Sequence, residues 1–400
     1  MMKFNLYLTE AASEEKLTHL EHAEDHVINA GFEGFSHAYH NLEDVHDQLQ
    51  GKKNKTTIMT KYDGSPSIVF GHHPETGQFF VASKSAFNKN PKLNYTPSDI
   101  EKNHGHAPGL VQKLKHALLH LPKVTPDKGV YQGDLMHSGV KSRENPEGDI
   151  DSHSGKYHFT PNTITYSTGH NSAEGKNIEK SKLGIVVHTA YSGKTFNKMK
   201  VDYAPDLSKF RKHPDVHDID NRNDVPSAKL TDNQSQAYQH HIANARKAFV
   251  ETPKEAYNVI SGDNEHHADH LKTYINKTVR EDTKPTLAGY RSHLKDQHAK
   301  AIVKVKTEKA IRAKTDSMTQ DLNHVDTNQK HFESILGMHH ELQRAKDQLE
   351  HALSAKPKFE HHIGNTPSKP EGYVVVRNNR PTKIVNRQVF SRANFLARPR

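Results

Sequence analysis

The 400-residue chain contains no cysteine, which excludes disulfides, thiolate zinc sites and cysteine nucleophiles. This absence suits a reducing compartment. No apolar run approaches the roughly 18 residues that a membrane-spanning helix needs, and the segment Met1–Tyr7 is too short for a signal peptide. We therefore expect a soluble, cytoplasmic protein without a membrane partner.

Two common nucleotide-binding signatures are also missing. The chain has no GxxxxGK[ST] phosphate loop and no GxGxxG sequence, which argues against a P-loop ATPase and a Rossmann enzyme. Hydrophobic residues make up only 33% of the chain, a low share for a globular protein. The 14 tyrosines and 15 phenylalanines cluster in strand-like segments, so we expect the packed core there.

Positive charge is concentrated near the C-terminus. The formal net charge is +9, and residues 361–400 contain eight Lys or Arg against a single acid, Glu371, for a local charge of +7. These charges alternate with strand-forming residues, as in Val374–Val376. A basic cluster of this kind favours a phosphate-rich ligand, and the alternative is a solubilising tail.

Hydrophobic periodicity divides the chain into segments of different character. Residues 1–50 have helical spacing with a break at Gly31. Residues 51–205 mix strands and helices, residues 206–360 have helical patterns only, and residues 361–400 return to strands. The sequence therefore predicts an α+β protein with antiparallel sheets, flanking helices and a large all-helical insertion.

The most informative stretch is Lys61-Tyr62-Asp63-Gly64, which closes one predicted strand and precedes another. Because side chains alternate along a strand, Lys61 and Asp63 are expected on one face. Gly64 lets the backbone turn sharply or approach a ligand. A lysine becomes a nucleophile when burial or neighbouring cations lower its pKa from about 10.4. The alternative is an ordinary strand-end turn with a solvated lysine.

Further segments in a fixed order strengthen the first interpretation. They are YQGDL (131–135), EGYVVV (371–376) and TKIVN (382–386). Together with KYDG they resemble motifs III, IV, V and I of the covalent nucleotidyltransferases, the superfamily of ATP-dependent RNA and DNA ligases and mRNA capping enzymes. SKS (83–85) resembles motif Ia, and LGIVVHT (183–189) resembles the apolar strand of motif IIIa.

This resemblance implies a ligase-type nucleotidyltransferase domain built from residues 51–205 and 361–400. It implies that Lys61 attacks the α-phosphate of ATP and forms a lysyl-AMP intermediate. Glu371 would bind Mg²⁺ or Mn²⁺ or help to deprotonate Lys61. Lys383 would neutralise the α-phosphate, as phosphoryl transfer requires cationic charge there.

The resemblance also implies the nucleotide contacts. Asp63 would contact the ribose or orient the nucleophile, Lys84 would contact phosphate or ribose, and Asp134 would hold the ribose hydroxyl. His188 or Tyr191 would stack on adenine. Nothing in the sequence selects GTP, so ATP is the expected donor, and nucleic acid (RNA or a nicked duplex) is the expected partner.

A second resemblance is narrower. Residues 18–195 are similar to a family of uncharacterised proteins from T4-like tailed phages, through segments that include EHAEDHVINAG and GVYQGDLMHS. This similarity implies a viral origin and the cytoplasm of an infected bacterium as the location.

The chain departs from the nucleotidyltransferase pattern in three ways. Val376 and Val385 stand where the superfamily commonly has lysine, and strand alternation prevents Arg377 from replacing the first of them. The helical stretch 206–360 is much longer than its counterpart. Two hypotheses follow: an ATP-dependent ligase or adenylyltransferase that acts on nucleic-acid ends, or a catalytically reduced ligase-like protein that binds nucleic acid or serves in phage assembly.

Histidine is unusually frequent, with 33 residues. His19, His22 and His26 fall on one helical face, and the spacing of the last two suits a metal ion. No histidine pair has an acid at a recurring spacing, so we expect solvated surface histidines rather than a zinc site.

Overall fold

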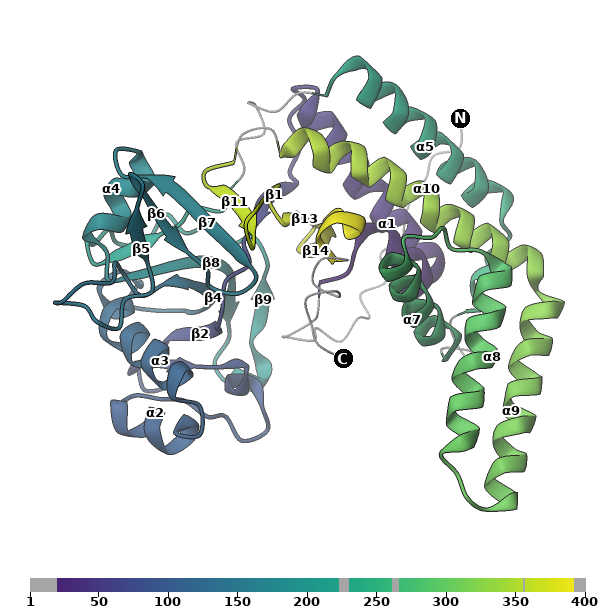
Figure 1. Cartoon of the computed structure of the whole chain (residues 1–400), viewed down its shortest axis with the longest axis horizontal. Coiled ribbons are helices and arrows are strands. Elements are labelled where there is room, and N and C mark those ends of the chain that lie inside the picture. The colour runs from purple at the N-terminus through teal and green to yellow at the C-terminus, as the bar shows by residue number, and fades with distance from the viewer. Residues whose placement is uncertain (1–19, 223–229, 261–265, 355–356, 392–400) are drawn as a thin grey trace. The chain divides into compact units, whose positions relative to one another are not determined.

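The computed structural model describes residues 20–222, 230–260, 266–354 and 357–391. The predicted helical pattern before residue 20 and the arginines after residue 391 lie outside these residues. None of the described helices is long and apolar enough to cross a membrane. The chain divides into two compact units (Figure 1). Among the described residues, the first unit is Gly64–Asn162 and Ser167–Asp220, and the second is 20–63, Thr163–Tyr166 and 221–391.

A mainly antiparallel sheet forms the centre of the first unit. Its strands follow the order β10-β8-β4-β2-β3, with β9 paired to β8. Only the pairing of β10 with β8 is parallel in this sheet. The strands are β2 (Ser67–His72), β3 (Phe79–Ala82), β4 (Val130–His137), β8 (Leu183–Ser192), β9 (Lys200–Asp202) and β10 (Val216–Asp218).

Neighbouring residues of each strand point to opposite sides of the sheet, and both sides are buried. Ile68 and Phe70 of β2 pack with residues of α2 (Pro97–His104) and α3 (Pro108–His120). Val69, between them, belongs to a separate cluster on the other face. The remaining elements of this unit are η2 (Lys84–Phe87), η3 (Leu121–Lys123), β5 (Asp151–His153), β6 (Lys156–Phe159), α4 (Ala173–Lys180) and η4 (Phe196–Lys198). Strand β7 (Ile164–Gly169) begins in the second unit and ends in the first.

The second unit contains a three-stranded antiparallel sheet in the order β1-β13-β14. Its strands are β1 (Thr57–Lys61), β13 (Gly372–Arg377) and β14 (Arg380–Ile384). Asn378 and Asn379 connect the last two strands with φ values of 50° and 57°, as a two-residue hairpin turn requires. The sheet therefore joins a strand near residue 60 to strands more than 300 positions later.

Helices make up most of the second unit (Figure 1). They are η1 (Ala23–Asp25), α1 (His26–Leu49), α5 (Asp232–Glu251), α6 (Lys254–Tyr257), α7 (His266–Glu281), α8 (Leu287–Val303), α9 (Glu308–Thr327), α10 (Gln329–Leu353) and the π-helix η7 (Arg387–Ser391). The hairpin of β11 (Glu360–Ile363) and β12 (Thr366–Ser368) completes this unit. The stretch predicted as a helical insertion, residues 206–360, contains helices α5 to α10. It is not all-helical as predicted, because its first residues, up to Asp220, belong to the first unit, where β10 pairs with β8, and β11 begins at Glu360.

These helices share one hydrophobic core with the small sheet. Leu42 of α1, Leu342 of α10 and Tyr238 of α5 belong to the same buried cluster as Val375 of β13 and Ile384 of β14. The helical stretch and the strands that carry the C-terminal motifs therefore stabilise one another. The fold is α+β with mainly antiparallel sheets, as the sequence predicts, while its relation to the ligases stays a prediction.

The predicted break at Gly31 lies inside α1. Ala30 and Gly31 have non-helical backbone angles, and Gly31 has a φ of 53°, which glycine adopts without steric cost. Two helical runs therefore meet at a kink and present Val27 and Phe35 to the same core.

Candidate functional site

The eight residues predicted from the motifs divide between the two units. Four of them, Lys61, Asp63, Glu371 and Lys383, belong to the second unit. The other four, Gly64, Lys84, Asp134 and His188, belong to the first unit.

Lys61 and Glu371 form a close ion pair. The Nζ atom of Lys61 lies 2.6 Å from each of the two carboxylate oxygens of Glu371. Strand pairing explains the contact, because Lys61, at the end of β1, is opposite Gly372, the residue after Glu371. The side chain of Glu371 is 9% exposed and that of Lys61 is 24% exposed. The carboxylate is thus buried, and the amine stays accessible to solvent.

Gly372 permits this arrangement. Its φ of 147° is unfavourable for other residues, and a Cβ atom there would lie 2.5 Å from the carbonyl oxygen of Ile384. The end of β14 therefore approaches the backbone beside Glu371 more closely than any side chain at position 372 would allow.

Lys383 adds a second cation to the same face of the sheet. Lys383 is opposite Val374, which is opposite Met59, two residues before Lys61. Alternation along the strands therefore puts both lysines on one face. Burial, reinforced by the charge of Lys61, lowers the pKa of Lys383 to about 8.

Burial has the opposite effect on the acid of this cluster. It raises the pKa of Glu371, although the adjacent Lys61 opposes the rise. Desolvation disfavours the charged form of both kinds of group. The cluster therefore combines an acid and a base whose proton affinities are shifted towards each other.

The lowered pKa of Lys383 predicts a pH-dependent stability. In the unfolded chain an unperturbed lysine stays protonated up to about pH 10.4, whereas the folded protein loses this proton near pH 8. Between these pH values the unfolded state binds more protons, so the free energy of unfolding rises with pH. From pH 8 to pH 10 the free energy of unfolding of the wild type, measured by urea denaturation, should rise by on the order of 1–3 kcal/mol relative to that of Lys383→Met. A constant difference between the two proteins would contradict a desolvated ammonium at this position.

Asp63 anchors the loop before β7. Its Oδ2 atom accepts hydrogen bonds from the backbone N–H groups of Thr163 (2.8 Å) and Ile164 (3.2 Å). Its own N–H donates to the hydroxyl of Tyr166 at 2.6 Å. The strand ends at Lys61, so the predicted alternation does not extend to Asp63. The carboxylate therefore holds the segment that follows the nucleophile candidate.

A buried polar cluster lies on the opposite face of β14 and was not predicted from the sequence. The Oγ1 atom of Thr382 is 3.1 Å from Nε2 of His26, 3.0 Å from Nε2 of His37 and 2.8 Å from Nδ2 of Asn41. Burial lowers the pKa of His37 to about 2, with His26 contributing further. These contacts tie β14 to α1 and so fix the strand position of Lys383.

The expectation of solvated histidines is wrong for much of the chain. Many histidines are buried, and several of these form hydrogen bonds to other side chains, as His26 and His37 do with Thr382. The buried ones include His26, His37, His104, His120, His137, His217, His267, His293, His298, His339 and His361. In the described part of the chain no group of three or more His, Asp or Glu is placed to hold a metal ion.

The positions where the superfamily commonly has lysine are apolar and buried. Val376 and Val385 are 4% and 2% exposed. Arg377 directs its Nε atom to Asp44 of α1 at 3.0 Å. It is therefore committed to an ion pair with α1, in agreement with the expectation that it does not replace the missing lysine.

In the first unit, Asp134 and His188 lie close together. The distance from Nε2 of His188 to Oδ1 of Asp134 is 3.5 Å, and both side chains are about one-quarter exposed. The register opposes Gln132 to Thr189 and Gly133 to Val187, which leaves His188 as the extra residue of a β-bulge. Bulges commonly redirect a side chain near functional sites.

The other residues predicted in this unit differ in accessibility. Tyr191 is 4% exposed and donates a hydrogen bond to Gln132, so His188 is the more accessible of the two candidates for stacking. Lys84 is exposed at the start of η2. Gly64 packs so closely on Asp134 that a Cβ atom would lie 2.6 Å from that of the aspartate.

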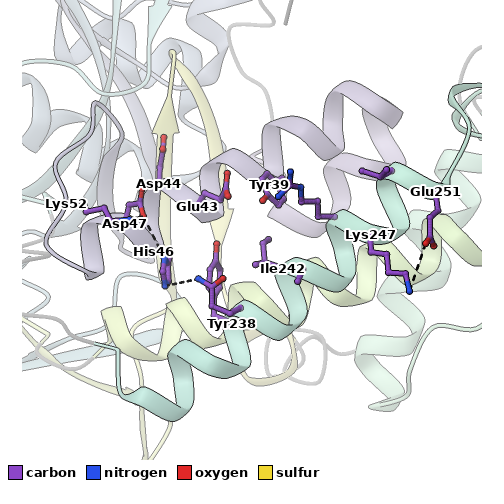
Figure 2. Close-up of a pocket in the computed structure, with 14 residues that line it drawn as sticks. Tyr39, Glu43, Asp44, His46, Asp47, Lys52, Tyr238, Ile242, Lys247 and Glu251 are labelled. Atoms are coloured by element: carbon purple, nitrogen blue, oxygen red, sulfur yellow. Dashed lines mark hydrogen bonds and ion pairs between the residues drawn. The ribbon is translucent and has the colours of Figure 1, made fainter. Parts of the chain in front are cut away.

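A groove of about 650 Å³ lies between α1 and α5 in the second unit (Figure 2). It contains none of the residues predicted from the sequence. Its carboxylates already have partners, as Asp47 has with Lys52 at 2.8 Å and Glu251 with Lys247 at 4.0 Å. Tyr238 forms part of its floor, stacked on His46 at 4.5 Å between ring centroids. This groove therefore does not contain the motif residues.

A metal ion bound near Lys61 would find few protein ligands. Glu371 is the nearest carboxylate, and the charge of Asp63 adds to the rise of its pKa. Proteins usually hold Mg²⁺ through one or two carboxylates together with substrate phosphates. Glu371, with Asp63 as the neighbouring carboxylate, would thus hold the ion only in part.

Together these observations define an α+β protein with a lysine–carboxylate pair at the end of a small antiparallel sheet and a second lysine on the same face. The chain belongs to a family of unknown function, DUF6267, which it matches over residues 17–398. Neither the comparison with curated proteins nor that with solved structures gives a match. The function is therefore inferred from the geometry of the site.

Proposed function

We propose that the protein is an ATP-dependent nucleotidyltransferase of the RNA or DNA ligase type, which forms a lysyl-AMP intermediate on Lys61. The observation that carries the proposal is the contact of Lys61 with both oxygens of Glu371 at 2.6 Å, with Lys383 on the same face. A nucleophilic amine, a proton acceptor and a phosphate-binding cation are the groups that this step requires. The order of the motifs supports the same proposal.

The step transfers one adenylyl group from ATP to Lys61. The Nζ atom of Lys61 attacks the α-phosphorus of ATP, the bond from that phosphorus to the bridging oxygen breaks, and pyrophosphate leaves with the bonding electrons. The ammonium of Lys61 first gives one proton to the adjacent carboxylate of Glu371, and the second proton passes to solvent as the bond from nitrogen to phosphorus forms. The product is a phosphoramidate between Lys61 and AMP. A bound Mg²⁺ or Mn²⁺ supplies further positive charge on the phosphate oxygens.

Proton removal is the requirement that the site meets most directly. With an unperturbed pKa of about 10.4, fewer than about one lysine in a thousand carries a free amine at pH 7. Burial raises the pKa of Glu371, which makes it a stronger base than a solvated carboxylate. Lys383, with its lowered pKa, is a cation that a phosphate would stabilise.

A second function is favoured by different residues. The buried Val376 and Val385 and the ion pair of Arg377 with Asp44 remove two cationic positions that the superfamily commonly uses. A ligase-like protein with reduced catalysis, which binds nucleic acid or a phage assembly partner, would tolerate these changes. The same labelling experiment separates the two functions.

The test is covalent labelling of the wild-type chain. After incubation with α-³²P-labelled ATP and Mg²⁺, we expect radioactivity that stays on the protein through a denaturing gel, together with release of pyrophosphate. Parallel reactions with α-labelled GTP and adenylate-labelled NAD define the donor. Absence of label with all three donors would reject the enzymatic function and favour the second one.

A further inference from the structure

The two helices α8 and α9 form a hairpin that extends from the rest of the second unit (Figure 1). Helix α8 ends at Val303 and α9 begins at Glu308, where the side chain of Thr307 caps the helix by accepting a hydrogen bond from the N–H of Ala310. At 1.5 Å per residue these helices are about 25 and 30 Å long. The far end of the hairpin is therefore well removed from its base.

The base of the hairpin contains buried residues and an ion pair between the two helices. Tyr290 and Leu294 of α8 and Val325 of α9 are fully buried. Arg291 binds both carboxylate oxygens of Asp326 at 2.8 Å. The buried residues and this ion pair join α8 to α9 at the base of the hairpin.

The far end has the opposite character. We use the term basic tip for six exposed cations at this end, and none of them forms an ion pair or hydrogen bond among the described residues. They are Lys300, Lys304, Lys306, Lys309, Arg312 and Lys314. Glu308 is the single acid between positions 300 and 314, so the local charge is +5. Val303 is 85% exposed and Ile311 is 38% exposed between these cations.

This distribution of charge does not serve folding. Like charges placed together without counterions repel one another and reduce stability. The chain has surface acids in reach of cations elsewhere, as for Arg291 and Asp326 at the base of the same hairpin. The tip keeps its charge unneutralised, as a surface that binds a polyanion does.

We infer that the basic tip binds the phosphate backbone of a nucleic acid. This inference specifies the nucleic-acid partner of the proposed function, and it rests on that function only for the choice of nucleic acid among polyanions. Six exposed cations gathered on the ends of two helices and on their connection provide the positive charge that binds a phosphate backbone. Val303 and Ile311 are two separate exposed apolar residues that lie between the cations in the sequence. Two such residues do not make the continuous apolar face that a membrane-inserting helix has.

The experiment measures binding of the full-length protein to fluorescein-labelled 24-nucleotide RNA, single-stranded DNA and a nicked duplex by fluorescence anisotropy. The tip variant replaces Lys304, Lys306, Lys309 and Arg312 with glutamine. We expect at least a tenfold loss of affinity at 100 mM salt. For the duplex, the slope of the logarithm of the binding constant against the logarithm of the salt concentration is negative. Its magnitude should decrease by roughly 3 to 4 in the tip variant, since each phosphate contact contributes about 0.9.

The matched control removes the same number of charges from exposed positions of the second unit, at Lys53, Lys247, Lys284 and Lys330. It should bind within about threefold of wild type, because nonlocal charge is screened beyond roughly 10 Å at 0.1 M salt. Equal affinities of tip variant and control variant would overturn the inference.

Two further measurements separate the possible failures. If wild type binds vesicles of anionic phospholipid through the tip but does not bind the oligonucleotides, the partner is a membrane and the inference fails. Covalent labelling of Lys61 is scored in the same proteins. Labelling without oligonucleotide binding rejects the inference alone, whereas tip-dependent binding without labelling rejects the proposed enzymatic function alone.

Discussion

Replacing Lys61 with alanine is expected to abolish covalent labelling by α-³²P-labelled ATP, to below 1% of the wild-type signal. The reason is that the phosphoramidate requires the Nζ atom of Lys61, and Lys383, which lies on the same face of the sheet, belongs to a different strand. The measurement is the radioactivity retained by the protein after a denaturing gel. Circular dichroism of the same preparation confirms that the variant is folded.

Two further variants make this result specific. Lys61→Arg keeps a cation beside Glu371, and its guanidinium stays protonated at working pH, so it should fold like wild type and still take no label. Lys53→Ala removes an exposed lysine eight positions earlier and should label normally. If Lys61→Ala labels as strongly as wild type, Lys61 is not the nucleophile.

Replacing Lys346 with alanine should destabilise the protein by about 3–5 kcal/mol. Lys346 of α10 and Glu24 of η1 are both completely buried, and the Nζ atom lies 2.8 Å from the carboxylate. Removal of the lysine leaves the buried carboxylate of Glu24 with Arg387, at 3.8 Å, as its remaining cationic partner among the described residues. The measurement is the free energy of unfolding from urea denaturation at pH 7.

A double replacement isolates the cause. Lys346→Met with Glu24→Gln removes both charges and conserves most of the volume, so it should cost clearly less than Lys346→Ala with Glu24 intact. A loss below about 1 kcal/mol for the single variant would mean that the unpaired carboxylate is solvated or protonated without cost. The same variants should not affect labelling at Lys61 in conditions where they remain folded.

The local elements followed from the sequence because their signals are local. The apolar runs at residues 68–70 and 79–81, with a turn at residues 74–77 between them, predict a hairpin, which the structure contains as β2 and β3. The apolar stripe that includes Phe332 and Leu349 predicts one long helix, and α10 extends over Gln329–Leu353. Asn378 and Asn379 predict the turn between β13 and β14, and both residues have the positive φ values of a tight hairpin.

The sequence predicted that Lys61 and Glu371 share a site only because the segments that carry them resemble motifs in the order of the superfamily. A single sequence gives no signal that Glu371 lies beside Lys61, 310 positions away, apart from the resemblance of both segments to known motifs. The contacts of Thr382 with His26 and His37 have no such guide, because a histidine looks the same in a sequence whether it is solvated or buried.

Other errors have a geometric origin. The prediction placed Asp63 in the alternation of the strand, but β1 ends two residues earlier and the carboxylate bonds to backbone N–H groups at the start of β7. The bulge that redirects His188 depends on the pairing of two strands, and strand register cannot be read from one strand alone.

During biosynthesis, β1 is made long before β13, the strand with which it pairs. At a synthesis rate of about 5–20 residues per second, roughly 15–60 s separate the emergence of Lys61 from that of Gly372, its partner in the sheet. During this interval the nascent chain carries an unpaired strand, Thr57–Lys61, which is open to incorrect pairing. Lys61 and Glu371 cannot come together in this way on a ribosome-bound fragment that lacks β13, so their ion pair forms only after synthesis has passed Gly372–Arg377.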